Sequence, residues 1–162
     1  MTTTENTITL GEYLFRRLRE TGIKSVFGVP GDFNLQLLDY IKDVPELKWV
    51  GNTNELNAAY STDGYSRLVG FGAIITTFGV GELSAVNGIA GSFACRIPLI
   101  HIVGMPSVEA TKEKLLLHHT LGDRKFDTFE KMSAPISDKT VVLDSIDKAG
   151  EIIDDIIEHG YK

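Results

Sequence analysis

The sequence has a single cysteine, Cys95, so no disulfide can form within the chain. Cys95 lies among small and apolar residues, where a buried structural thiol is the usual outcome, and we expect it to be buried and unreactive. No apolar run approaches the roughly 18 residues that cross a bilayer, and residues 1–6 lack the apolar segment of a secretory signal. These absences predict a cytoplasmic protein with no membrane attachment.

Clustered basic charge is missing as well. The formal net charge is −6, and Arg16, Arg17 and Arg19 stand beside Glu12 and Glu20 on a predicted helix, as on an ordinary solvated helix face. Because nucleic-acid phosphates are bound by concentrated positive charge, the sequence argues against a nucleic-acid partner.

Two common kinds of site lack their signatures. His118 and His119 are adjacent and would point in different directions on a regular element, and no spacing of Cys or carboxylate residues completes a zinc site. The turn at residues 79–82 has two glycines but not the third that the dinucleotide fingerprint requires, and no phosphate-loop motif occurs. We therefore predict no metal ligands in the chain. The glycines indicate a tight turn against a planar group rather than a nucleotide phosphate site.

The composition is that of one globular domain, with 162 residues, 43% of them hydrophobic and 23% charged. Apolar runs of strand length alternate with segments of helical periodicity. The predicted strands are residues 25–29, 47–50, 73–78, 99–104 and 140–143, and the predicted helices are residues 10–22, 34–42, 54–68, 83–94, 127–132 and 145–158. This alternation predicts an α/β fold with a parallel sheet between two layers of helices, a three-layer arrangement.

Polar and glycine-rich segments follow the predicted strands. In a parallel sheet these segments meet beyond the carboxyl ends of the strands, where such folds bind their ligands. They are residues 30–32, 52–55, 78–81 and 104–106.

Local pattern leaves two interpretations open for each candidate residue. Asp32 either caps the following helix or lies at the mouth of the cleft. Glu55 either stabilises a helix N-terminus or, among apolar neighbours, acts as a proton relay. His118 and His119 suit acid–base chemistry near neutral pH, whereas His101, inside an apolar strand, reads as structural.

Four segments carry a specific resemblance: residues 26–34 (VFGVPGDFN), 54–67 (NELNAAYSTDGYSR), 76–85 (TTFGVGELSA) and 115–122 (LLLHHTLG). Together, and over nearly the whole chain, they resemble the fungal pyruvate decarboxylases, which use thiamine diphosphate (thiamine pyrophosphate, TPP) as cofactor. The resemblance implies that Glu55 hydrogen-bonds N1′ of the cofactor's aminopyrimidine and activates it. It also implies that Asp32, His118 and His119 position the substrate and move protons.

The same resemblance implies which residues touch the cofactor and what else the site needs. The cofactor-binding residues would be Glu55, Pro30, Thr77, Phe78, Gly79 and Val80. Residues 1–162 would form a single pyrimidine-binding (PYR) domain without the central and diphosphate-binding domains, because the Gly-Asp-Gly…Asn signature that supplies Mg²⁺ ligands is absent.

We therefore expect a 2-oxo acid substrate, with pyruvate foremost, and a homo-oligomer whose active site is completed by the diphosphate-binding domain of another subunit. The isolated chain should be inactive. Cys95-Arg96 stands where yeast-type members often carry Glu-His, so the substrate activation linked to that pair is not expected. The alternatives are a non-catalytic fragment or regulatory subunit that associates with a full-length decarboxylase, and a stand-alone nucleotide-binding module.

Overall fold

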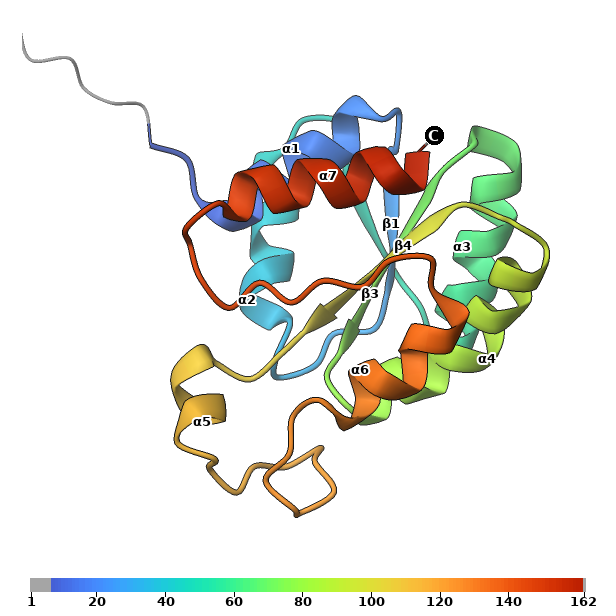
Figure 1. The fold of residues 1–162 in the computed structure, drawn as a ribbon. Helices are drawn as coiled ribbons and strands as arrows, with labels where there is room; N and C mark the ends of the chain where they lie inside the picture. The colour runs from blue at the N-terminus through green and yellow to red at the C-terminus, as the bar shows by residue number, and fades with distance from the viewer. Residues whose placement is uncertain (1–6, 162) are drawn as a thin grey trace, which may run out of the picture.

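Four parallel strands form the single sheet of the computed structural model, which describes residues 7–161 (Figure 1). The spatial order is β2-β1-β3-β4. In register, Val26 lies opposite Trp49, and Ile75 lies opposite Ile102. The strands are β1 (Ser25–Gly28), β2 (Lys48–Gly51), β3 (Gly72–Thr77) and β4 (Leu99–Gly104). The first four strands of the prediction are confirmed to within two residues at each end.

Each predicted helix has a counterpart in the structure with shifted ends, and one short helix, residues 108–112, was not predicted. The α-helices are α1 (Leu10–Glu20), α2 (Leu35–Leu38), α3 (Glu55–Val69), α4 (Val80–Ala94), α5 (Val108–Lys112), α6 (Thr128–Ser133) and α7 (Ala149–Tyr161), and the 3₁₀ segments are η1 (Asp39–Asp43) and η2 (Ala134–Ile136). The predicted helix 34–42 is thus one α-turn followed by a 3₁₀ segment, and α4 begins three residues before the prediction. In the part of the chain that the structure describes, no helix combines the length and apolarity needed to span a membrane.

Helices cover both faces of the sheet, as the three-layer α/β prediction requires. α1 and α7 lie side by side over one face, and α3 and α4 pair over the other (Figure 1). Alternate residues of β3 serve the two layers: Ile75 packs in the cluster with Phe15 of α1 and Ile153 of α7, whereas Ile74 packs with Ala59 and other residues of α3 and α4. Each large aliphatic side chain buried in this way contributes about 1.5–3 kcal/mol.

Two sequence predictions are wrong. Residues 140–143 form no strand: Val141, Val142 and Leu143 are exposed, and within residues 7–161 no ladder pairs with them. Their β-branched composition favours a strand, but an extended segment needs a hydrogen-bonded neighbour. Cys95 is exposed rather than buried because it is the C-cap of α4 and lies beyond the helix face that packs on the sheet. The prediction for residues 1–6 falls outside the described residues.

Candidate active site

The predicted site residues lie at one edge of the sheet because each follows the carboxyl end of a parallel strand. Asp32 comes after β1, and Glu55 begins the helix after β2. Thr77 ends β3 and leads into the turn at Gly79. His118 belongs to the long segment between β4 and α6, which projects beyond this edge (Figure 1).

Glu55 is held against the first turn of α4. It is the first residue of α3, whose N-cap Asn54 accepts hydrogen bonds from Leu56 N (2.8 Å) and from Ser84 Oγ of α4 (3.2 Å). A Cβ added to Gly81 would lie 3.0 Å from Glu55 Oε1, so only glycine leaves the carboxylate its present place. Its position is therefore set by two helices rather than by α3 alone.

Thr77 lies between the two glycines that line this part of the edge. A Cβ on Gly31 would stand 2.6 Å from Thr77 Cβ, and one on Gly81 would stand 2.9 Å from Thr77 Cγ2. The side chain is 4% exposed, and its Oγ1 has no hydrogen-bond partner among the described residues. A buried hydroxyl without a partner costs about 1–3 kcal/mol. Thr77 thus fills the space that side chains at Gly31 and Gly81 would need, and it leaves an unpartnered hydroxyl close to the Glu55 carboxylate.

Asp32 pairs with a histidine rather than capping a helix. Its Oδ2 lies 3.0 Å from His118 Nε2, and Phe33 stacks on the His118 ring with centroids 4.9 Å apart and planes 17° apart. The side chains of Asp32 and His118 are 71% and 52% exposed, so the pair faces outward. Asn34 fixes the loop below it: its Oδ1 accepts from Gly31 N (2.9 Å), and its Nδ2 donates to the Val29 carbonyl (3.1 Å).

His119 faces inward from the same segment. Its ring centroid is 4.5 Å from that of His118, and its backbone adopts φ 62°. The Nδ1 atom is buried and has no hydrogen-bond partner in the described part of the chain. The two adjacent histidines therefore point differently, as the sequence suggests, and both contact Phe33.

The turn at Gly79 connects the part of the edge that holds Glu55 and Thr77 with the segment that carries His118 and His119. Gly79 adopts φ 70° and ψ −101°, which side-chain-bearing residues rarely occupy. A Cβ there would overlap the carbonyl oxygen of His119. The predicted neighbours differ in exposure: Phe78 is buried against Phe129, with ring centroids 5.1 Å apart, whereas Val80 is exposed at the start of α4.

Glu82 is a residue that sequence analysis missed. Its Oε1 accepts a hydrogen bond from Gly79 N at 2.9 Å, although the side chain is only 4% exposed. Burial raises the pKa of this carboxyl to about 6; the hydrogen bond from Gly79 opposes the rise, and the charge of Glu130 adds to it. The sequence did contain a signal for this role: Glu82 stands three residues after Gly79, the residue that precedes the helix, and this is the spacing of a capping box.

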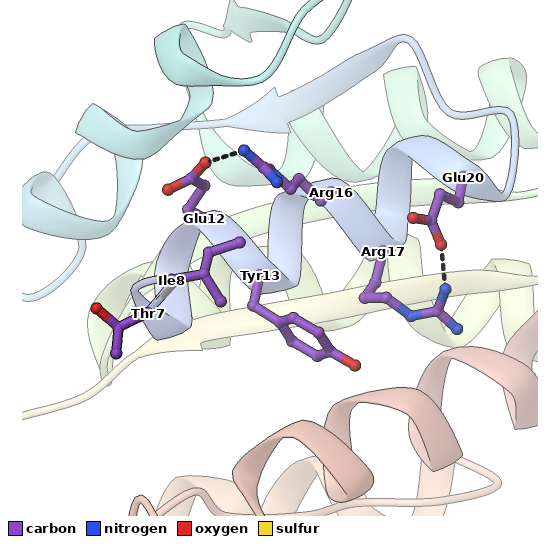
Figure 2. A pocket seen from close by; sticks show the side chains of 7 residues that line it. All are labelled: Thr7, Ile8, Glu12, Tyr13, Arg16, Arg17 and Glu20. Atoms are coloured by element: carbon purple, nitrogen blue, oxygen red, sulfur yellow. Dashed lines mark hydrogen bonds and ion pairs between the residues drawn. The ribbon is translucent and has the colours of Figure 1, made fainter. Parts of the chain in front are cut away.

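Two further features lie away from the edge that carries the site. His101, in β4, shares a 2.8 Å hydrogen bond with Thr76 Oγ1, and burial lowers its pKa to about 4, which fits the predicted structural role. A hollow of about 530 Å³ runs along α1 between Thr7 and Glu20, where the charged groups are already paired, as Glu12 is with Arg16 (Figure 2). No predicted site residue lines it.

Among residues 7–161, no group of three or more His, Cys, Asp or Glu residues is arranged to hold a metal ion.

The chain is similar in sequence to known proteins of one family. Residues 8–130 match the family model of the thiamine pyrophosphate enzyme, N-terminal TPP binding domain. The chain is 55% identical over 154 residues to the pyruvate decarboxylase of Kluyveromyces lactis and to pyruvate decarboxylase isozyme 1 of Saccharomyces cerevisiae, and 54% identical over 154 residues to that of Hanseniaspora uvarum. In each case the match covers 95% of this chain and 27% of the relative. The chain thus spans about a quarter of the length of these proteins.

Proposed function

The chain belongs to the thiamine pyrophosphate enzymes through their N-terminal TPP binding domain, and we propose that it is the pyrimidine-binding part of a decarboxylase that converts pyruvate to acetaldehyde and carbon dioxide. The observation that carries the proposal is the place of Glu55, a carboxylate held against Gly81 and beside the unpartnered hydroxyl of Thr77.

The residues present fit the aminopyrimidine of TPP. Glu55 would bind N1′, because a carboxylate accepts a strong hydrogen bond from a protonated ring nitrogen. Thr77 offers a buried hydroxyl that lacks a partner among the described residues. Gly31 and Gly81 let Thr77 and Glu55 pack closely against the backbone of this edge, and the exposed Val80 offers the ring an apolar surface. Pro30 and the Gly79 turn would complete the wall.

When bound, TPP supplies the electron sink that 2-oxo acid decarboxylation requires. The chain's own contribution on the substrate side is proton handling. Asp32 Oδ2 and His118 Nε2 are close enough to share a proton, and Phe33 holds the imidazole plane. His119 presents a second imidazole from the same segment, with Nδ1 free of any partner among the described residues. A pair of this kind can deliver and remove protons at neighbouring atoms of a bound 2-oxo acid.

This domain supplies only one wall of the proposed site. Mg²⁺ and the diphosphate would be bound by a further domain, contributed by another subunit of a homo-oligomer. The outward-facing Asp32–His118 pair supports this arrangement, because such a pair becomes effective when a partner surface removes it from water.

Reconstitution tests the proposal. The part of Saccharomyces cerevisiae pyruvate decarboxylase isozyme 1 that follows the matched region would be produced separately and mixed with this chain, TPP, Mg²⁺ and pyruvate. We expect acetaldehyde from the mixture and none from either half alone. The proposal fails if the two halves form a complex that releases carbon dioxide from no 2-oxo acid. Inhibition of an intact decarboxylase by the added chain would instead favour a regulatory subunit.

A further inference from the structure

Glu82 is a buried carboxylate to which the proposed function assigns no role. It is the only charged residue of α4, and β3, which packs beside α4, contributes no titratable side chain. Glu55 of α3 lies at Gly81, on the other side of the turn. The charged group that acts on it is Glu130 of α6, whose carboxylate repels it. Its one hydrogen bond in the described structure is the one that it accepts from Gly79 N.

Gly79 is also the point at which the histidine segment rests on the sheet. The His119 carbonyl oxygen lies directly against the Cα of Gly79, where a Cβ would overlap it. His119 is itself in the left-handed region, so its backbone has little freedom to adjust. Any movement of the Gly79 turn therefore has to be matched by the backbone of His119. On the other side, the same turn leads through Val80 to Gly81, whose Cα lies against the Glu55 carboxylate.

We propose that Glu82 is a positioning residue: by capping the Gly79 amide it fixes the turn against which the His119 backbone rests, and so holds the pyrimidine wall and the proton-handling histidines in one geometry. The inference rests on the proposed function, which assigns pyrimidine binding to the residues around Glu55 and proton transfer to the histidine segment. The link itself is a property of the chain without cofactor or substrate.

The burial of Glu82 makes this link sensitive to pH. Protonation near pH 6 exchanges a charged acceptor for a neutral one and removes the repulsion from Glu130. The Gly79 amide then loses a charge-assisted hydrogen bond, and the change is passed to the His119 carbonyl.

Nuclear magnetic resonance of the whole chain tests the link directly. In Glu82→Ala, hydrogen exchange at the Gly79 amide should rise about tenfold or more, and the carbonyl ¹³C resonance of His119 should move. Glu82→Gln keeps an acceptor oxygen of the same reach, so it should restore both features while abolishing the pH step near 6 that the wild-type Gly79 amide shows. Glu130→Gln should move that step to lower pH.

Glu12→Ala is the matched control, because Glu12 occupies the same third position of α1, far from the edge; it should change neither signal. The inference is overturned if Glu82→Ala leaves the exchange of Gly79 unchanged, or if Gly79 loosens while the His119 carbonyl does not move. If Glu82→Ala does not fold, the pH titration of the other proteins decides. The inference is overturned if the wild-type signals of Gly79 and His119 do not both change near pH 6, or if that change survives in Glu82→Gln. None of these readouts involves TPP, so they remain interpretable if the decarboxylase proposal fails.

Discussion

The Nε2 atom of His118 lies 3.0 Å from Oδ2 of Asp32, so that segments following β1 and β4 meet across the edge of the sheet. Phe33 stacks beneath the imidazole, and Asn34 holds the loop that presents the carboxylate. The pair is exposed, so it adds little to stability. Its geometry is better explained by what it could do for a ligand.

Replacing Asp32 should separate activity from stability. In the reconstituted enzyme, Asp32→Ala should lower pyruvate turnover about 100-fold or more, as loss of an acid–base group does. The free energy of unfolding of the chain should change by less than about 1 kcal/mol, because the ion pair is exposed. Asp127→Ala breaks the exposed pair with Lys131 on α6 and is the control; it should leave turnover unchanged. Equal turnover in the two variants would contradict the assignment of Asp32.

Gly79 and Gly91 lie at opposite ends of α4 and should respond oppositely to alanine. Gly79→Ala should destabilise the chain by about 2 kcal/mol or more, because the backbone has φ 70° and a Cβ would overlap the His119 carbonyl. Gly91 is helical and has open space around it, so Gly91→Ala should stabilise by about 0.5–1 kcal/mol. Urea unfolding measures both. A Gly79→Ala variant as stable as the wild type would show that the turn is not as constrained as described.

The ionisation of Glu82 should leave a signature in the pH dependence of stability. Burial raises its pKa from 4.5 to about 6, so folding takes up a proton between these values. The stability provided by the protonated carboxyl is fully present below pH 4.5 and is lost as the pH rises through 6. A shift of this size corresponds to at most about 2 kcal/mol.

Glu82→Gln cannot titrate, which isolates this contribution. The free energies of unfolding of this variant and of the wild type would be measured in urea from about pH 4 to pH 8. As the pH rises, the wild type should lose up to about 2 kcal/mol relative to the variant. Glu12→Gln serves as the control, since that residue lies in the first turn of the surface helix α1. A difference between Glu82→Gln and wild type that stays constant across this range would contradict the described burial of Glu82.

Sequence patterns predicted the architecture because periodicity reports which faces are buried. Ile74 and Ile75 lie in an unbroken apolar run, which only a strand covered on both sides accommodates. The run at residues 140–143 was wrongly predicted as a strand because its composition reports strand propensity but not whether a neighbouring strand is present to pair with it. Cys95 misled because its small and apolar neighbours suggest a core position, whereas it is the C-cap of α4 and lies beyond the helix face that packs on the sheet.

The sequence named the candidate residues of the site but not their contacts. Glu55 follows from its place at the start of a helix after a strand, together with the family resemblance. The approach of His118 to Asp32 depends on the path of a long irregular segment, which no periodicity encodes. The unpartnered Thr77 hydroxyl is visible only when every buried polar atom is accounted for in three dimensions.

The proposed role of Glu55 as the carboxylate that activates the cofactor of a decarboxylase can be tested in a chimera. The matched region of the Kluyveromyces lactis pyruvate decarboxylase would be replaced by this chain, and turnover of pyruvate would be compared for the chimera, its Glu55→Gln variant and its Glu12→Gln variant. Both substitutions neutralise a glutamate in the first turn of a helix. We predict an active chimera, a loss of about 100-fold or more in Glu55→Gln and no change in Glu12→Gln. Full turnover in Glu55→Gln would mean that Glu55 does not activate the cofactor.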